Sequence, residues 1–149
     1  MFNVLVVEDD SKLRQLFCTV LTRNGYHAIP AVNGEDALAV LDKEFIDLII
    51  CDVMMPRMDG FELTQTLREN NQQLPILMVT ARENFADKQQ GFLVGIDDYM
   101  VKPINVNEMV LRVGALLRRA KINNERKIAW GGGPCWITMS LLFIREGRA

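Results

Sequence analysis

Polar and charged side chains follow four apolar runs of the sequence, at the point where each run ends. They are Glu8, Asp9 and Asp10 after residues 4–7, Asp52 after residues 48–51, Thr80 after residues 75–79 and Lys102 after residues 99–101. Carboxylates at close quarters repel one another, and Mg²⁺, which prefers oxygen ligands in a near-octahedral arrangement, relieves that repulsion. A lysine beside the same carboxylates would neutralise charge and hold a phosphoryl group. These residue types therefore indicate phosphoryl chemistry that depends on a divalent cation.

This chemistry requires a fold that gathers the polar residues, and the hydrophobic pattern predicts one. Apolar runs predict strands at 4–7, 26–31, 48–51, 75–79 and 99–101, and helical spacing predicts helices at 11–23, 33–42, 61–69, 84–94 and 105–119. Strands that alternate with helices are typical of an α/β protein with a doubly wound, five-stranded parallel sheet and five helices. In such sheets ligands bind beyond the carboxyl ends of the strands, where the polar residues listed above are expected to lie.

Single residues mark the ends of several predicted elements. Asn24-Gly25 stops the first helix, and Asn33 is suited to cap the second. Asn105 followed three residues later by Glu108 has the spacing of a capping box. Pro30 cannot donate a ladder hydrogen bond, so the strand that contains it is predicted to lie at an edge of the sheet.

Composition narrows the class of protein. The chain has 149 residues, of which 49% are hydrophobic and 24% charged, with a formal net charge of −2. These values predict a globular chain with one main domain and argue against disorder and against binding nucleic acid by charge alone. The three cysteines form no CxxC pair, so neither a disulfide framework nor a zinc site is indicated, and reduced thiols fit a cytoplasmic location. No apolar run has the length of a membrane span.

The last 28 residues break the alternating pattern. Residues 123–127 predict a polar linker, Gly131-Gly-Gly-Pro134 interrupts regular structure, and the remainder is too short for an independent domain. The sequence thus predicts a domain over 1–121 and a linker with an aberrant or truncated tail over 122–149. The tail contains no recognition helix, so we expect no DNA binding by this chain alone.

Four motifs resemble those of a known family. They are VLVVEDD at 4–10, LIICDVMMPRMDG at 48–60, PILMVTA at 75–81 and DDYMVKP at 97–103. Together, in this order, they resemble the response-regulator receiver domain of two-component systems over about residues 1–121. The region around the last helix resembles the OmpR/PhoB-like branch, whose winged-helix effector domain is absent or truncated here. The resemblance implies a flavodoxin-like fold with strand order 2-1-3-4-5.

The resemblance also implies a role for each acidic residue. Asp52 would accept a phosphoryl group from the phosphohistidine of a sensor histidine kinase. Asp9, Asp52 and the backbone carbonyl of Met54 would bind Mg²⁺, and Glu8 would act directly or through a water molecule. The chain would be a phosphoacceptor switch, with only weak self-catalysed phosphorylation and dephosphorylation, rather than an enzyme.

Three further residues acquire roles from the same resemblance. Thr80 and Lys102 would bind phosphoryl oxygens, and Tyr99 would be the switch that turns inward when Thr80 moves. The Lys102-Pro103 peptide bond is expected to be cis.

The resemblance further implies a homodimer that forms on phosphorylation, with contacts made by charged residues near the last helix. It would use the fourth helix, the fifth strand and the fifth helix. The implied contacts across the twofold axis are Lys88 with Glu108, Asp98 with Arg112, Asp97 with Arg119 and Phe92 with Val110.

Two other functions compete with the phosphorylation-driven transcriptional switch. An aspartyl-phosphate phosphatase uses a similar nucleophile, but it needs an acid two residues later, where this chain has Met54. A stand-alone receiver that acts by protein–protein contact would need no effector domain. A nucleotide-binding module is disfavoured, because no glycine-rich phosphate loop follows any predicted strand.

Overall fold

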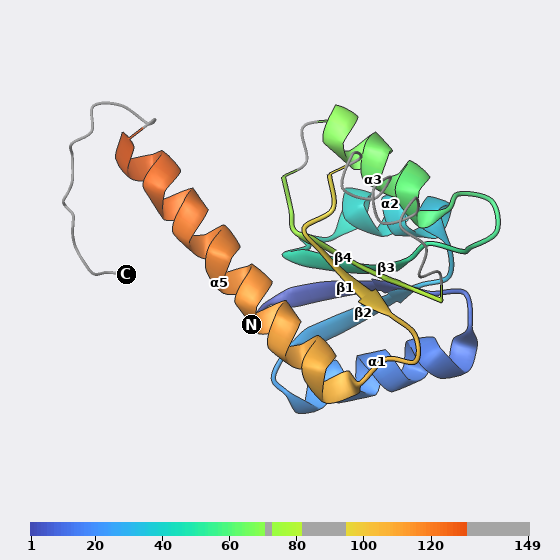
Figure 1. Cartoon of the computed structure of the whole chain (residues 1–149). Helices are drawn as coiled ribbons and strands as arrows, with labels where there is room; N and C mark the ends of the chain where they lie inside the picture. The colour runs from blue at the N-terminus through green and yellow to red at the C-terminus, as the bar shows by residue number, and fades with distance from the viewer. Residues whose placement is uncertain (71–72, 82–94, 131–149) are drawn as a thin grey trace. The chain divides into compact units, whose positions relative to one another are not determined.

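The computed structural model describes residues 1–70, 73–81 and 95–130, with side chains described as far as residue 122 (Figure 1). Its strands are β1 (Asn3–Val7), β2 (His27–Ala31), β3 (Leu48–Asp52), β4 (Ile76–Thr80) and β5 (Asp98–Val101). They form one sheet in the order β2-β1-β3-β4-β5, and every neighbouring pair is parallel. The predicted doubly wound α/β fold and its strand order are therefore confirmed.

The described helices are α1 (Ser11–Arg23), α2 (Gly34–Lys43), α3 (Gly60–Glu69) and α5 (Val106–Trp130). The bounds of α1 agree with the prediction, and α2 begins one residue later because Asn33 is its N-cap, as expected. The predicted helix at 84–94 lies outside the described residues. Among the helices that the described ranges contain, none is both long and apolar enough to cross a membrane.

Pro30 explains the position of β2 at the edge of the sheet. Its register partner is Val6 of β1, and β1 is the one strand with which β2 pairs. A proline in a central strand would remove a ladder hydrogen bond on one side, whereas at an edge the missing donor faces away from the ladder. The prediction of an edge strand is confirmed.

The core lies on both faces of the sheet in the unit formed by Met1–Leu116. Successive strand residues point to opposite faces, so uninterrupted apolar runs such as Leu48–Cys51 supply both layers. In one layer α2 and α3 cover the sheet, and Ala37 and Phe61 join its buried cluster. On the other face, Phe17 and Leu21 of α1 are fully buried. Because the strands are packed on both faces, the positions of their carboxyl ends, and of the polar residues there, are fixed.

The end of α5 differs from the prediction. The helix was expected to stop near Arg119 and to be followed by a polar linker at 123–127, but it continues to Trp130. Residues 120–130 contain no glycine or proline and include alanine, lysine, arginine and glutamate, which favour helix, and three glycines follow. A polar composition alone is therefore a poor sign of a linker. The second compact unit, Leu117–Ala149, begins within this helix, and the predicted domain boundary at 121 stays a prediction.

Capping also differs in detail from the prediction. The Asn105 side chain accepts hydrogen bonds from the backbone N–H of Asn107 and Glu108, but the Glu108 carboxylate accepts from Arg112. A complete capping box is instead present at α3, where Asp59 and Glu62 each accept from the other's backbone N–H. This box begins α3 directly after the loop that follows β3.

Candidate functional site

The carboxyl edge of the sheet brings together the residues on which the predicted chemistry depends. β3 ends at Asp52 and β4 at Thr80, while Glu8 and Lys102 directly follow β1 and β5. The ladder pairs Asp52 with Val79 and Thr80 with Val101, so these strand ends are in register. Residues far apart in the sequence therefore meet at one edge because the strands are parallel.

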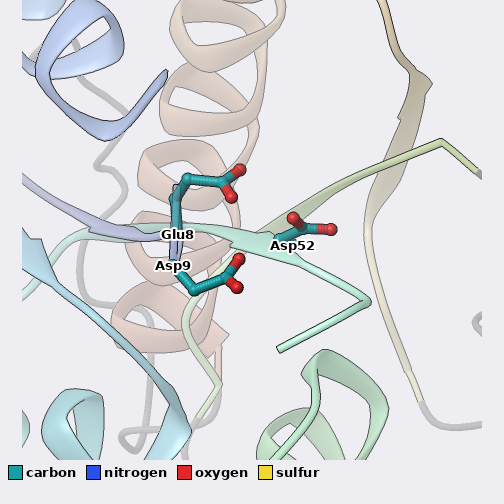
Figure 2. Close-up of side chains that lie close together, drawn as sticks. All are labelled: Glu8, Asp9 and Asp52. Atoms are coloured by element: carbon teal, nitrogen blue, oxygen red, sulfur yellow. The ribbon is translucent and has the colours of Figure 1, made fainter. Parts of the chain in front are cut away.

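Three carboxylates gather at this edge. Ligand oxygens of Glu8, Asp9 and Asp52 all lie within 4.8 Å of one another, and Figure 2 shows Glu8 and Asp9 on the side of Asp52. Glu8 and Asp52 are 1% and 3% exposed, whereas Asp9 is exposed to solvent. Burial of Glu8, followed by the nearby charge of Asp52, raises the pKa of the Glu8 carboxyl from 4.5 to about 7. The cluster is thus costly to ionise without a cation.

These side chains fit a hard divalent cation. Glu8 Oε1 is buried and accepts no hydrogen bond within the described residues, and its one charged contact there is the ion pair with Lys102, so this oxygen can serve as a ligand. The donor set of two or three carboxylate oxygens, one of them exposed, is the kind that Mg²⁺ binds while it keeps several waters. An acidic, oxygen-only cluster matches Mg²⁺ better than a soft metal.

Lys102 provides the positive charge of the site. Its Nζ lies 2.8 Å from Asp52 Oδ2 and 3.2 Å from Glu8 Oε1, although only the Asp52 contact has hydrogen-bond geometry. Burial alone would lower the pKa of Lys102, but the hydrogen bond and charge of Asp52, with the charge of Glu8, raise it above its usual value. The lysine therefore stays protonated and balances part of the buried negative charge.

The loop after β3 engages the other oxygen of Asp52. The backbone N–H of Met54 donates to Asp52 Oδ1 at 3.1 Å, while the Met54 side chain is 56% exposed. Gly60, at the start of α3, packs against the backbone of Asp52, and a Cβ at this position would lie 2.4 Å from the Asp52 carbonyl oxygen. Sequence reasoning placed Gly60 only at the end of the motif at 48–60, before the helix predicted at 61–69, and missed this contact.

Thr80 and Tyr99, the residues of the predicted switch, lie on neighbouring strands, and the switch stays a prediction. Thr80 is fully buried at the end of β4. Tyr99 in β5 is half-buried, packs against the core cluster and pairs in the ladder with Met78, two residues before Thr80. The Lys102-Pro103 peptide bond is cis, as expected.

Residues assigned to the dimer make contacts within one chain. Arg112 Nη1 donates to both carboxylate oxygens of Asp98 at 2.8 and 2.9 Å, and its Nε donates to Glu108. Asp97 accepts from Arg68 of α3 at 3.1 Å and from the backbone N–H of Ile76. Each of the three charge pairs expected between protomers thus has at least one member with a partner inside the protomer, which spacing along one helix could not reveal.

The remaining residues assigned to the dimer are known only by their burial or lie outside the described ranges. Val110 is half-buried and Arg119 is exposed, while Lys88 and Phe92 lie outside the described residues. The implied dimer contacts stay a prediction.

The fold and the site together define a class: a doubly wound α/β protein with an acidic cluster and a lysine at the carboxyl edge of its sheet. The chain belongs to the response regulator receiver domain family, whose model matches residues 4–114. It is therefore a signalling domain of a two-component response regulator.

Curated relatives agree with this family. The heme response regulator HssR of Staphylococcus epidermidis is 41% identical over 131 residues, which cover 88% of this chain and 58% of that protein. HssR of Staphylococcus aureus is 39% identical over the same length. The chain thus spans less than two thirds of the length of the curated relatives it matches.

Solved structures share the fold and the topology. The Francisella response regulator 1452 receiver domain is 34% identical with a TM-score of 0.77, and the match covers 80% of this chain and 99% of that one. The Vibrio cholerae chemotaxis protein CheY4 is 36% identical with a TM-score of 0.74, over 78% of this chain and 98% of that one.

Proposed function

We propose that Asp52 is the phosphoacceptor of this receiver domain, and that the phosphoryl donor is the phosphohistidine of a sensor histidine kinase. The observation that carries the proposal is the Asp52 carboxylate at the end of β3, 2.8 Å from Lys102 Nζ and within 4.8 Å of the ligand oxygens of Glu8 and Asp9. A nucleophile for an anionic donor needs positive charge beside it, and here that charge comes from the lysine and from a cation held by the acids.

In the proposed transfer a carboxylate oxygen of Asp52 attacks the phosphorus of the phosphoimidazole. The new P–O bond forms as the P–N bond breaks, and the ring, protonated on its other nitrogen in the donor, takes the electron pair of the P–N bond and leaves as neutral imidazole. Lys102 Nζ, already on Asp52 Oδ2, is placed to follow the charge onto a phosphoryl oxygen, and the Met54 N–H orients Oδ1. Bound Mg²⁺, held by Asp9, Asp52 and the Met54 carbonyl with Glu8 beside it, would neutralise charge on the transferred group.

The consequence of phosphorylation is a change of conformation that begins at Thr80 and Tyr99. Thr80 lies at the same sheet edge as Asp52, and β5 carries both Tyr99 and, one residue past its end, Lys102. A phosphoryl group that draws Thr80 and Lys102 toward it would therefore act on the ends of two neighbouring strands, β4 and the Tyr99-bearing β5. We propose that this change promotes a homodimer and controls transcription through an effector domain, as in OmpR/PhoB-like response regulators. A stand-alone receiver acting through protein contacts is the second candidate.

The proposed setting is the cytoplasm, where sensor kinases present their phosphohistidine and where reduced thiols persist. Cys51 supports a reducing environment only weakly, because it is fully buried and burial raises the pKa of its thiol well above the usual value. Its neighbour Asp52, rather than the thiol, is the nucleophile of this strand end.

Intact mass spectrometry after exposure to acetyl phosphate tests the proposed function. With Mg²⁺ the protein gains the mass of one phosphoryl group, and with EDTA it gains none. Asp52→Asn abolishes the gain, whereas the matched change Asp42→Asn, at an exposed position of α2, leaves it intact. Stoichiometric modification of Asp52→Asn would refute the assignment.

A further inference from the structure

The turn that carries Glu8 and Asp9 places two neighbouring carboxylates close together. In an extended strand consecutive side chains point to opposite faces. Here the two neighbouring carboxylates both lie on the side of Asp52 (Figure 2). The chain bends at Asp9, between the end of β1 at Val7 and the start of α1 at Ser11, and local contacts must hold this turn against the repulsion between the acids.

Several backbone contacts hold the first part of this turn. The Glu8 N–H donates to the Ala31 carbonyl at 3.1 Å, which continues the ladder with β2. The Asp10 N–H donates to Glu8 Oε2, and the Asp10 side chain caps α1 by accepting from the N–H of Lys12 and Leu13. These contacts leave the carbonyls of Glu8 and Asp9 to find partners elsewhere.

Arg14, on the first turns of α1, supplies that partner. Its Nη1 donates to the Glu8 carbonyl at 2.7 Å and lies 3.4 Å from the Asp9 carbonyl, which it also contacts as a donor. One half-buried guanidinium thus contacts both peptide groups that follow the proposed ligand residues. Because an arginine side chain is always charged, the contact is stronger than one between neutral groups.

The choice of acceptor atoms matters for cation binding. A guanidinium paired with the carboxylates would compete with a metal ion for their oxygens. By donating to the carbonyl oxygens, Arg14 fixes the turn and adds positive charge nearby, and Glu8 Oε1 accepts no hydrogen bond from the part of the chain that the structure describes. The arginine therefore stabilises the cluster without occupying it.

We propose that Arg14 is a positioning residue for the divalent-cation site: it holds the Glu8–Asp9 turn in the shape that lets both carboxylates serve one ion beside Asp52. The proposal rests on the function proposed above. Sequence reasoning missed this residue, and the one available signal was a cation six residues after Glu8 on the first helix.

Isothermal titration with MgCl₂ on the full chain tests this role. Arg14→Met, which keeps the apolar stem and loses the donors, is expected to weaken Mg²⁺ binding about tenfold. Arg14→Lys, which keeps charge and one donor group on a shorter stem, is expected to give an intermediate affinity. Arg23→Met is the matched control, because Arg23 lies exposed on the last turn of the same helix, and its affinity should equal that of the wild type.

Two further measurements separate positioning from simple stabilisation. In the acetyl phosphate reaction, Arg14→Met is expected to raise the Mg²⁺ concentration for half-maximal phosphorylation about tenfold and to leave the rate at saturating Mg²⁺ within about twofold of the wild type. Urea unfolding in EDTA shows that the variant is folded. A residue that only stabilised the fold would lower the urea midpoint and leave the Mg²⁺ affinity of the folded protein unchanged.

The outcomes are distinguishable. Equal Mg²⁺ affinities for Arg14→Met, Arg23→Met and the wild type would overturn the role of Arg14 and leave the proposed function standing. A wild type that binds Mg²⁺ in an Arg14-dependent way but is not phosphorylated on Asp52 would overturn the proposed function alone. A wild type that binds no Mg²⁺ would overturn both.

Discussion

Glu8 offers the sharpest test of the electrostatics of the site, through the pH dependence of stability in the absence of divalent cations. The pKa of its carboxyl is about 7 in the folded chain against an ordinary value of 4.5. Between these values the folded state binds more protons than the unfolded state. The free energy of unfolding therefore falls as pH rises from 4.5 to 7 and levels off above the folded pKa.

The magnitude follows from the same two values. The two pKa values differ by roughly 2.5, so the loss of stability is on the order of 3 kcal/mol. Because Lys102 and water relax around the charge, we expect about 2 to 3 kcal/mol. Glu8→Gln removes the charge with little change of shape, so the variant should be more stable than the wild type at pH 8.5 by about this amount and nearly equal to it at pH 5.

Urea unfolding followed by circular dichroism in EDTA, at pH 5, 6, 7 and 8.5, measures this difference. Glu44→Gln is the matched control, since Glu44 is exposed just after α2, and it should follow the wild-type curve. Saturating Mg²⁺ at pH 8.5 should stabilise the wild type, by about 2.7 kcal/mol at a concentration of 100 Kd, and Glu8→Gln less. An equal pH slope for wild type and Glu8→Gln would refute the reasoning.

Three further substitutions test other parts of the structure. The exposed thioether of Met54 cannot orient a water molecule for attack on the acyl phosphate, whereas the amide of Met54→Asn can. The variant should therefore shorten the lifetime of the acyl phosphate, measured as loss of phosphoryl mass. An unchanged lifetime would count against an effect of Met54 on hydrolysis. Gly60→Ala forces a Cβ against the Asp52 carbonyl and Met78 Sδ, and should cost about 2 kcal/mol in urea unfolding; a cost near zero would mean that the loop shifts freely. Arg68→Met removes the hydrogen bonds that the guanidinium donates to the carbonyls of Leu74 and Gly95, and should lower the free energy of unfolding by about 2 kcal/mol. The rate of Asp52 phosphorylation should stay unchanged, because these contacts lie at the opposite edge of the sheet.

Much of the fold could be predicted because its signals are local. The strand at Leu48–Cys51 is apolar throughout, which is the pattern of a strand covered on both faces, and Pro30 requires an edge. The helix Ser11–Arg23 has apolar residues at helical spacing and a stop signal directly after it. Once strands and helices alternate, the handedness of their connections limits the topology to few choices, so the meeting of Glu8, Asp52, Thr80 and Lys102 followed from strand ends alone.

The errors of prediction came from signals that are ambiguous locally. A polar stretch after Arg119 is compatible with a linker and with a solvated helix, and its lack of glycine and proline favoured the helix. The spacing of Asn105 and Glu108 allows a capping box, but Arg112 on the next turn attracts the Glu108 carboxylate more strongly than a backbone N–H does.

By itself the sequence determined which residues can take part in the chemistry and which edge of the sheet they share. Only the tertiary structure decided what each of them contacts: that Lys102 donates to Asp52 and forms an ion pair with Glu8, and that Arg112 and Arg68 bind Asp98 and Asp97 within one chain. It also assigned Arg14 to the carbonyls of the acidic turn. The physical reason is that strand register places a residue to within a few ångströms, whereas hydrogen bonds, burial and pKa values change over distances of about 1 Å and depend on neighbours that come from other elements.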